Sequence, residues 1–375
     1  MREKILVMLS TQVLGDNRIT KYQNFFLEHG ICKVLNIHFL NKTYKNTDKE
    51  IVFSINGNKL GKRLDILCRR SKIIHDLEKV IPGDAEPIFM LHDPILLALT
   101  TKIKSKWGKG IKVIYDRHEY YETLKTLRIF HEFFWYEKLF IDSIDFLICV
   151  NKEHRLKTCS LFKKINTNNS CIVHNYPTSK AYIPVSELLE LKNQTPFISY
   201  VGSLNWNADR DVKLMIDCIK ALEVAKIRYN CVFAGPTFDD KLTEILLTLQ
   251  ETTNNRFQYL GIVSRNVAVK ITVKSHIGFC LLNNSYNAAY SPNKIFEYIY
   301  YGVIPFARYN PSDDLTMYDG NIYDFSVDRN KIIQDFVDLV SNRDLLNKKI
   351  NHIIKQGCPF LWENDMEILQ AFVAK

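Results

Sequence analysis

Residues 290–306 read YSPNKIFEYIYYGVIPF, and this stretch decides how the chain is expected to fold. It follows a short apolar run at 276–282 that predicts a strand buried on both faces. Ser291 can cap the free N–H groups of a helix, and Pro292 suits the first helical position. Gly302 suits the helix end, and the apolar residues after it begin another strand. Between Pro292 and Gly302, apolar residues recur at near-helical spacing: Ile295, Phe296, Ile299 and Tyr300.

The helix N-terminus in this stretch is a candidate anion site. Exposed N–H groups and the helix dipole attract phosphate, and Asn293 is expected at this end beside Pro292. Lys294 adds a full positive charge. A carboxylate one turn later, Glu297, would repel phosphate but can accept hydrogen bonds from a sugar diol. The stretch therefore predicts a site for a ligand that carries both phosphate and hydroxyl groups.

The same alternation of strands and helices runs through both halves of the chain. In the second half, strands are expected at 197–201, 231–234 and 257–260, with helices at 212–223, 240–248 and 267–273. In the first half, strands are expected at 5–10, 34–39, 88–91, 113–116, 146–150 and 171–173. Short apolar strands alternating with helices are typical of parallel α/β sheets. The fold class predicted is therefore two tandem Rossmann-like, doubly wound domains.

The first strand–helix–strand unit argues against a nicotinamide-binding domain. The loop at 11–16 carries a single glycine, Gly15, so the three-glycine dinucleotide fingerprint is absent. Asp16 and Arg18 stand at the start of the following helix, where they can cap it or line a ligand site.

Length and composition set broad limits. At about 150 residues per domain, 375 residues suggest two domains. The net charge of +9 fits an anionic substrate, an anionic membrane surface or nucleic acid. Nine scattered cysteines without zinc spacing indicate free thiols in a reducing compartment. Neither a signal peptide nor an apolar run long enough to cross a bilayer is predicted.

The domain boundaries are expected where the apolar pattern weakens. Residues 177–196 are interpreted as the linker. This places an N-terminal domain at 1–180 and a second domain at 196–357. The last helix, within 358–375, is amphipathic and is expected to pack back on the first domain.

Segments in a fixed order support a family resemblance. They are GDNRITKYQNFFLEHG (15–30), VIYDRHEYYE (113–122), VHNYP (173–177), ISYVGSLNWNADRD (198–211) and the opening stretch (290–306). With these segments the chain resembles the family-4 type of retaining glycosyltransferases, which have the GT-B fold. The match spans nearly the whole length, and the last segment is the most specific. The resemblance implies transfer of a sugar from a nucleoside diphosphate sugar, at a cleft between two domains, with retention at the anomeric carbon.

The resemblance also implies that 1–180 is the acceptor-side domain and 196–357 the nucleotide-sugar-binding domain, and it assigns roles to donor-side residues. Arg210 matches the family's basic residue after the turn at Gly202, and Glu297 matches its ribose-binding carboxylate. With Lys294 and the N–H groups near Pro292 and Asn293, Arg210 would hold the diphosphate, where electrostatic stabilisation of the leaving group matters most. The donor-binding set is Gly202, Ser203, Arg210, Gly235, Gly261, Ser291, Pro292, Asn293, Lys294 and Glu297.

The first domain contributes the acceptor side and one residue at the reaction centre. His118 follows a strand end and is expected to contact the transferred sugar rather than act as a base. The catalytic set is thus His118, Glu297 and Arg210, and the acceptor-side set is Gly15, Asp16, Arg18, His118 and Glu119. No metal and no cofactor are expected. A UDP-sugar is favoured over a GDP-sugar as the co-substrate.

Two positions depart from the family pattern. The first of two family glutamates is replaced by Ala289, so the identity of the donor sugar stays open. Ser203 stands where a basic residue is common, so binding of the diphosphate would depend more on Arg210 and Lys294.

Partners and rival functions follow from the same features. A glycan or polyprenyl-linked acceptor in surface polysaccharide synthesis is expected, with no nucleic acid. Basic clusters at 59–72 and 102–112, and the aromatic stretch 130–146, are consistent with a cytoplasmic protein at the inner face of the cell membrane. The rivals are a non-catalytic nucleotide-sugar-binding subunit and a GT-B-fold nucleotide-sugar epimerase.

Overall fold

A computed structural model describes most of the chain. The described residues are 3–12, 14, 16–40, 47, 49–54, 65–118, 131–179, 183–206, 210–283, 293–309 and 321–374, without the side chains of 131–134. Contacts divide the chain into an N-terminal unit, Met1–Asn175 with Trp362–Lys375, and a C-terminal unit, Tyr176–Ala288 with Pro292–Leu361. Each unit is an α/β layer structure with a parallel sheet, as the sequence predicts.

The sheet of the N-terminal unit has the order β3-β2-β1-β4-β5-β6-β7. Its strands are β1 (Lys4–Ser10), β2 (Lys33–Leu40), β3 (Glu50–Ser54), β4 (Glu86–Leu91), β5 (Val113–Arg117), β6 (Phe146–Cys149) and β7 (Ser170–Ile172). The helices are α1 (Asn17–Glu28), α3 (Arg70–Val80), α4 (Thr100–Trp107), α5 (His131–Phe140), α6 (Lys152–Leu161) and α14 (Met366–Ala374), with a 3-10 turn η1 at Pro94–Leu99.

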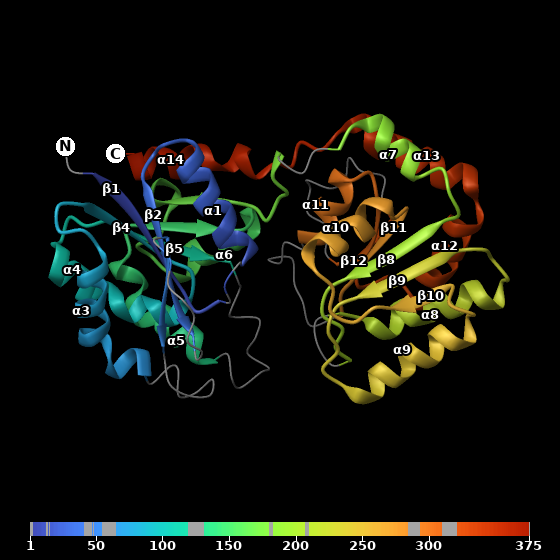
Figure 1. The fold of residues 1–375 in the computed structure, drawn as a ribbon, viewed down its shortest axis with the longest axis horizontal. Helices are drawn as coiled ribbons and strands as arrows, with labels where there is room; N and C mark the ends of the chain where they lie inside the picture. Colours follow the sequence, from blue (N-terminus) through green and yellow to red (C-terminus); the bar gives the residue numbers. More distant parts are fainter. Residues whose placement is uncertain are drawn as a thin grey trace. The chain divides into compact units, whose positions relative to one another are not determined.

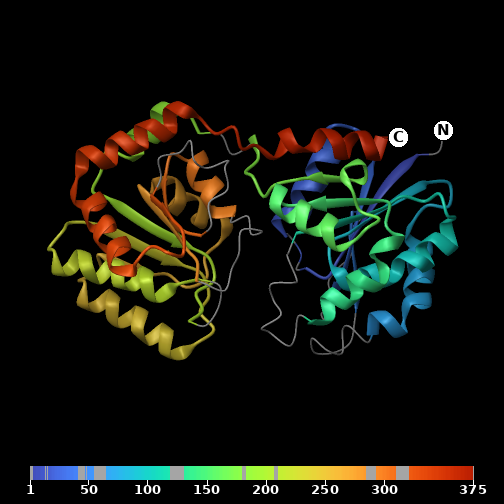
Figure 2. The same cartoon turned by 180° about the vertical axis from the view of Figure 1, so that it is seen from behind.

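Alternating residues of these strands form two apolar cores, one on each face of the sheet. Leu6, Met8 and Ile114 face α1 and α14, whereas Val7, Leu9 and Tyr115 face the opposite layer with α3 and η1. Figures 1 and 2 both show α1 and α14 on one side of the strands and α3 and α4 on the other. Trp362 is almost fully buried against Tyr22 of α1, with ring centroids 4.9 Å apart, so the last segment of the chain completes this unit.

The sheet of the C-terminal unit has the order β10-β9-β8-β11-β12-β13. Its strands are β8 (Phe197–Val201), β9 (Asn230–Ala234), β10 (Phe257–Tyr259), β11 (Ile277–Leu281), β12 (Ile304–Arg308) and β13 (Asn321–Tyr323). The helices are α7 (Val185–Leu191), α8 (Val212–Val224), α9 (Asp240–Thr252), α10 (Arg265–Lys274), α11 (Asn293–Tyr300), α12 (Arg329–Ser341) and α13 (Arg343–Gln356). Figures 1 and 2 show α8 and α9 on one side of this sheet and α7 and α13 on the other.

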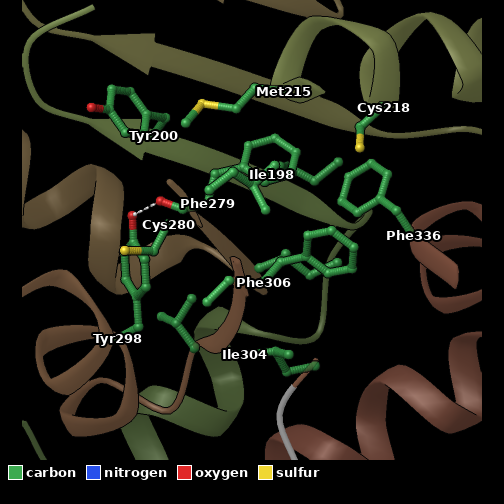
Figure 3. Close-up of a cluster of buried hydrophobic side chains, with 14 of the residues drawn as sticks. Ile198, Tyr200, Met215, Cys218, Phe279, Cys280, Tyr298, Ile304, Phe306 and Phe336 are labelled. Atoms are coloured by element: carbon green, nitrogen blue, oxygen red, sulfur yellow. Dashed lines mark hydrogen bonds between the residues drawn. The ribbon is translucent and has the colours of Figure 1, made fainter. Parts of the chain in front are cut away.

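Aromatic side chains from β11 and its neighbours fill the core of the C-terminal unit. The Phe279 ring lies 5.1 Å from Phe336 and 6.0 Å from Phe306, measured between centroids. Figure 3 shows the Tyr298 hydroxyl of α11 donating to the Phe279 carbonyl, at 3.1 Å. A β-carbon on Gly278 would lie 2.4 Å from the Tyr298 ring, so the glycine lets α11 pack directly on β11.

The sequence pattern left several elements unassigned. Helix α7 lies inside the segment expected to be a linker, and the elements α3, α6, α12, α13 and β13 were not anticipated. Helix α7 escapes detection because it is only seven residues long and has one buried apolar residue, Leu188. Among the residues described, no helix is both long and apolar enough to cross a bilayer. All nine cysteines, each at a described position, are free thiols.

A buried histidine makes the stability of the C-terminal unit depend on pH. His276 is 0 % exposed, and its Nδ1 accepts a hydrogen bond from the Phe197 N–H at 3.0 Å, which requires an unprotonated nitrogen. Burial, with the nearby charges of Lys192 and Arg343, lowers the pKa of His276 to about 4. Burial likewise lowers the pKa of Lys192 to about 7, although its ammonium group donates to the carbonyls of Val273 and Ser275.

Between pH 4 and about 6.5, the unfolded chain binds a proton at His276 that the folded chain does not. The free energy of unfolding should therefore rise with pH across this window, by at most about 3 kcal/mol from this group. Urea unfolding of the wild type and of His276→Asn, measured from pH 4.5 to 7.5, tests this. The variant should show a smaller rise, whereas the exposed His75→Gln should behave as wild type. Equal slopes in wild type and His276→Asn would contradict the assignment.

Candidate functional site

The donor-side candidates gather at one edge of the sheet in the C-terminal unit. From β8 the chain adds β9 and β10 on one side, and it then places β11 on the other. The carboxyl ends of β8 and β11 therefore flank the point where the strand order reverses, which is where open α/β sheets bind ligands. Gly202 follows β8 directly, and Arg210 pairs with Leu282 at the end of β11.

Glycines let the chain segments at this edge approach one another closely. Gly202 N–H donates to the Ala234 carbonyl at 2.8 Å, and Gly235 N–H donates to the Gly261 carbonyl at 2.7 Å. Gly202, Gly235 and Gly261 have φ angles of 153°, 142° and 61°, which other residues rarely adopt. A β-carbon on Gly235 would lie 2.0 Å from the Gly202 carbonyl oxygen. The turns after β8, β9 and β10 thus form one continuous backbone surface.

Lys294 brings a positive charge to this surface. Its ammonium group donates to the Val201 carbonyl and lies 5.5 Å from the centre of the Tyr200 ring. It is also only 3.0 Å from where a β-carbon of Gly202 would stand. The Tyr200 hydroxyl in turn donates to the Ser203 carbonyl at 2.8 Å, which steadies the turn. The structure therefore brings Gly202, Ser203 and Lys294 together.

Glu297 lies one turn beyond Lys294 on α11 and is half-buried. The neighbouring Ile295, Phe296 and Tyr298 are buried, so the helix is held firmly by its apolar face. Among the described residues, the Glu297 carboxylate has no hydrogen-bond or ion-pair partner, which makes its oxygens available to a ligand. Asn293, the first residue of the helix, is exposed.

Arg210 is held at its position by the next residue. The Asp211 side chain caps α8 by accepting from the Leu214 N–H at 3.0 Å, and its second oxygen pairs with Arg308 and Arg329. The Asp211 N–H donates to the Leu281 carbonyl at 2.9 Å. The backbone of Arg210 is thereby fixed beside the end of β11, and its charge acts on Tyr298 of α11.

The described acceptor-side candidates of the N-terminal unit lie at the carboxyl edge of its own sheet, after β1 and β5. Asp16 caps α1 by accepting from the Arg18 and Ile19 N–H groups at 3.0 and 3.2 Å. The guanidinium of Arg18 is bonded within the unit, to both Asp116 oxygens at 2.7 Å and to Asn175. The half-buried His118 follows β5 directly, with Nδ1 3.2 Å from the Asp116 carbonyl oxygen.

Sequence reasoning missed the charged network beneath His118. Asp116 and Arg117 are both 0 % exposed and pair with residues from distant parts of the chain. His92 joins them, with Nδ1 3.1 Å from Asp116. The available signal was the pair Asp116–Arg117 at the end of an apolar strand, because buried charges require partners.

Four sequence candidates lie outside the described residues: Gly15, Glu119, Ser291 and Pro292. Ala289 lies outside them too. Within the described residues, no group of three or more His, Cys, Asp or Glu side chains is placed to hold a metal ion.

Comparison with known family models and curated protein sequences finds no match. Comparison with solved structures finds the same two-unit fold over essentially the full chain. WaaG, described as a glycosyltransferase involved in lipopolysaccharide biosynthesis, has a TM-score of 0.69 at 9% identity, covering 99% of each chain. The lipopolysaccharide outer core galactosyltransferase WaaB has a TM-score of 0.63 at 16% identity, covering 98% of this chain and 99% of its own.

A third similar structure was determined with ligands bound. HepE from Anabaena, in complex with UDP and glucose, has a TM-score of 0.63 at 10% identity, covering 99% of this chain and all of its own. At these identities the comparisons show the fold, and the chain has the GT-B architecture of these glycosyltransferases.

Proposed function

We propose that this protein is a retaining glycosyltransferase that moves a sugar from a nucleoside diphosphate sugar to a glycan acceptor. The observation that carries the proposal is the arrangement at the β8–β11 edge. There the Lys294 ammonium lies against Gly202, and the Glu297 carboxylate stands one turn further along α11 without a partner among the described residues. A cation beside glycine turns suits a diphosphate, and an available carboxylate suits a ribose diol.

The chemistry assigns a separate task to each group. When the bond between the anomeric carbon and the diphosphate breaks, negative charge develops on the leaving oxygen. Lys294 and Arg210 would stabilise that charge, and such preorganised electrostatic stabilisation is usually the largest catalytic contribution. Glu297 would hold the nucleotide through its ribose, and His118 of the N-terminal unit would contact the transferred sugar. The acceptor hydroxyl attacks the anomeric carbon from the face that the diphosphate leaves, and its proton passes to an oxygen of the departing diphosphate.

The substrate classes follow from the same proposal. HepE, which shares the fold, was crystallised with UDP and glucose, and this supports a UDP-sugar as the donor. WaaG and WaaB are both named for lipopolysaccharide, which supports a surface glycan or its lipid-linked precursor as the acceptor. A cytoplasmic protein at the inner face of the membrane, using no metal or other cofactor, is part of this proposal.

Thermal denaturation against a panel of nucleotides and nucleotide sugars provides the first test. A ligand that binds only the folded chain stabilises it, by about 2.7 kcal/mol at 100 times its Kd. UDP and one UDP-sugar should raise the Tm, and that sugar should then be transferred to an acceptor glycan with its anomeric configuration kept.

The outcomes separate the rival functions. Failure of every nucleotide to raise the Tm would contradict the proposal outright. Binding of UDP without transfer to any acceptor would favour a non-catalytic subunit. Formation of an epimeric UDP-sugar without acceptor, seen by NMR, would favour an epimerase.

A further inference from the structure

The carboxyl end of β5 carries buried charges on both faces of its sheet. Successive residues of a strand point to opposite faces, so Asp116 and Arg117 face opposite layers. Both side chains are 0 % exposed, and His118 follows them directly. On one face the Asp116 carboxylate pairs with a cation, and on the other the Arg117 guanidinium pairs with an anion.

On the α1 face, Asp116 is held by two cationic or polar partners. Its oxygens accept from Arg18 Nε and Nη2, both at 2.7 Å, in the bidentate geometry that fixes a carboxylate most firmly. His92 Nδ1 lies 3.1 Å from the same carboxylate. Burial alone would raise the pKa of Asp116, but Arg18 and His92 outweigh it and hold this pKa well below its usual range. The carboxylate is therefore ionised and fixed.

On the opposite face, Arg117 is held by α5 and α6. Its Nε and Nη2 donate to the two oxygens of Glu137 at 2.7 and 2.8 Å. Its Nη1 donates to Thr158 Oγ1 and to His154 Nε2, each at 2.8 Å. His154 therefore accepts at Nε2 and is neutral, and burial followed by the Arg117 charge lowers its pKa.

Stability alone does not explain this arrangement. A buried ion pair recovers little more than its cost of desolvation, and apolar residues of similar volume often serve as well or better. Two such pairs on adjacent residues instead fix the backbone of β5 from both faces. The backbone carbonyl of Asp116, which lies between the two anchors, is the group 3.2 Å from Nδ1 of His118.

We infer that the Arg18–Asp116 and Arg117–Glu137 pairs are positioning devices for His118, which fix its imidazole in one orientation and one tautomer. Nδ1–H donates to the Asp116 carbonyl, so Nε2 carries the lone pair and can accept from a hydroxyl of the bound sugar. The inference depends on the proposed function only in giving His118 a sugar to contact. The tautomer itself is a property of the free protein.

The test uses Arg117→Met combined with Glu137→Gln. This double variant buries no unpaired charge, and the amide oxygen introduced by Glu137→Gln can still accept from the Tyr115 hydroxyl, which in the wild type donates to Glu137 at 2.8 Å. Nitrogen NMR of the full chain should show the Nδ1–H tautomer of His118 in the wild type and a mixture in the variant. The value of kcat should fall roughly 10- to 100-fold, as misplacement of a group that orients the reacting substrate does. The KM for the nucleotide sugar should stay within about twofold, since its proposed ligands lie in the C-terminal unit.

A matched control lies at the other end of the same strand. Lys104 pairs with Asp145 at 2.7 Å, and Asp145 accepts from the Val113 N–H, so Lys104→Met with Asp145→Asn perturbs the start of β5. This control should leave the His118 tautomer and kcat unchanged. If the first double variant does not fold, Thr158→Val removes one hydrogen bond from Arg117 without unbalancing charge, and a smaller shift of the same kind is expected.

The decisive comparison repeats Arg117→Met with Glu137→Gln in a His118→Ala background. If the two ion pairs act through His118, the double substitution should lower kcat by less than about a further twofold in the His118→Ala background. An equal loss in both backgrounds, or an unchanged tautomer in a folded variant, would overturn the inference. Failure of the proposed function would show differently: the wild type would transfer no sugar, while the NMR measurement would still report on the anchors.

Discussion

Glu297→Ala should lower kcat/KM by at least roughly 100-fold while the fold stays intact. A hydrogen bond to a charged group contributes about 1.5–3 kcal/mol, and a carboxylate that holds a ribose diol makes two of them. The side chain is half-buried and has no partner among the described residues, so its removal leaves none of them unpaired. Steady-state transfer assays, with the Tm measured in parallel, check both parts of the expectation.

Two further variants calibrate this result. Glu297→Gln keeps an acceptor oxygen and should fall between wild type and Glu297→Ala. Glu244→Ala removes an exposed carboxylate from α9, a helix that contributes no candidate site residue, and should be neutral. Full activity of Glu297→Ala would refute the assignment of the site at α11.

Gly235→Ala should abolish nucleotide binding and destabilise the C-terminal unit. The added β-carbon would lie 2.0 Å from the Gly202 carbonyl oxygen and 2.5 Å from its carbon, and a backbone cannot give way as a flexible side chain can. The φ angle of 142° is a second source of strain. Together these effects should cost at least the roughly 1–3 kcal/mol typical of overpacking and separate the turns after β8 and β9. Calorimetry with UDP and urea unfolding measure the two losses.

Two other glycines provide graded controls. Gly261 has a positive φ of 61°, but a β-carbon there meets nothing within 4 Å, so Gly261→Ala should cost only about 1 kcal/mol of backbone strain. Gly83, in the N-terminal unit, has open space and no such φ, so Gly83→Ala should match wild type. If Gly235→Ala binds UDP and unfolds like Gly83→Ala, the close contact of the two turns is not essential to the site.

Local sequence signals were sufficient for the parallel strands other than the edge strands β3 and β13, and for many of the helices that flank them. The run at 276–282 and the Ser291–Pro292 start predicted β11 and α11, and α11 begins at Asn293. The apolar pattern did not predict α7, because few of its side chains are buried. It also could not predict the burial of charged side chains that depend on a partner of opposite charge. Lys192, a buried lysine at the end of α7, looked like a linker residue because its carbonyl partners lie about 80 positions away.

The candidate site divides in the same way. Gly202 and Lys294 could be chosen from the sequence because one follows a strand end and the other begins a helix, and these are local features. Glu297 was chosen because it matches a family motif within 290–306. Arg18 was expected to line a ligand site, and the structure shows its guanidinium donating to the carboxylate of Asp116, a residue 98 positions away. No local pattern shows which acid a buried arginine will meet.

The sequence by itself determined the alternation of short apolar strands with helices, and hence two parallel sheets with candidate ligand sites at their carboxyl edges. Periodicity and capping depend on neighbours within a few residues, so they can be read along the chain. Only the tertiary structure decided that Gly202, Gly235 and Lys294 meet at one edge of the C-terminal unit, and that opposite ion pairs fix the strand before His118. These contacts join residues tens of positions apart or more. A buried charge is costly unless it is paired, and which charges are buried is decided only when the chain has folded.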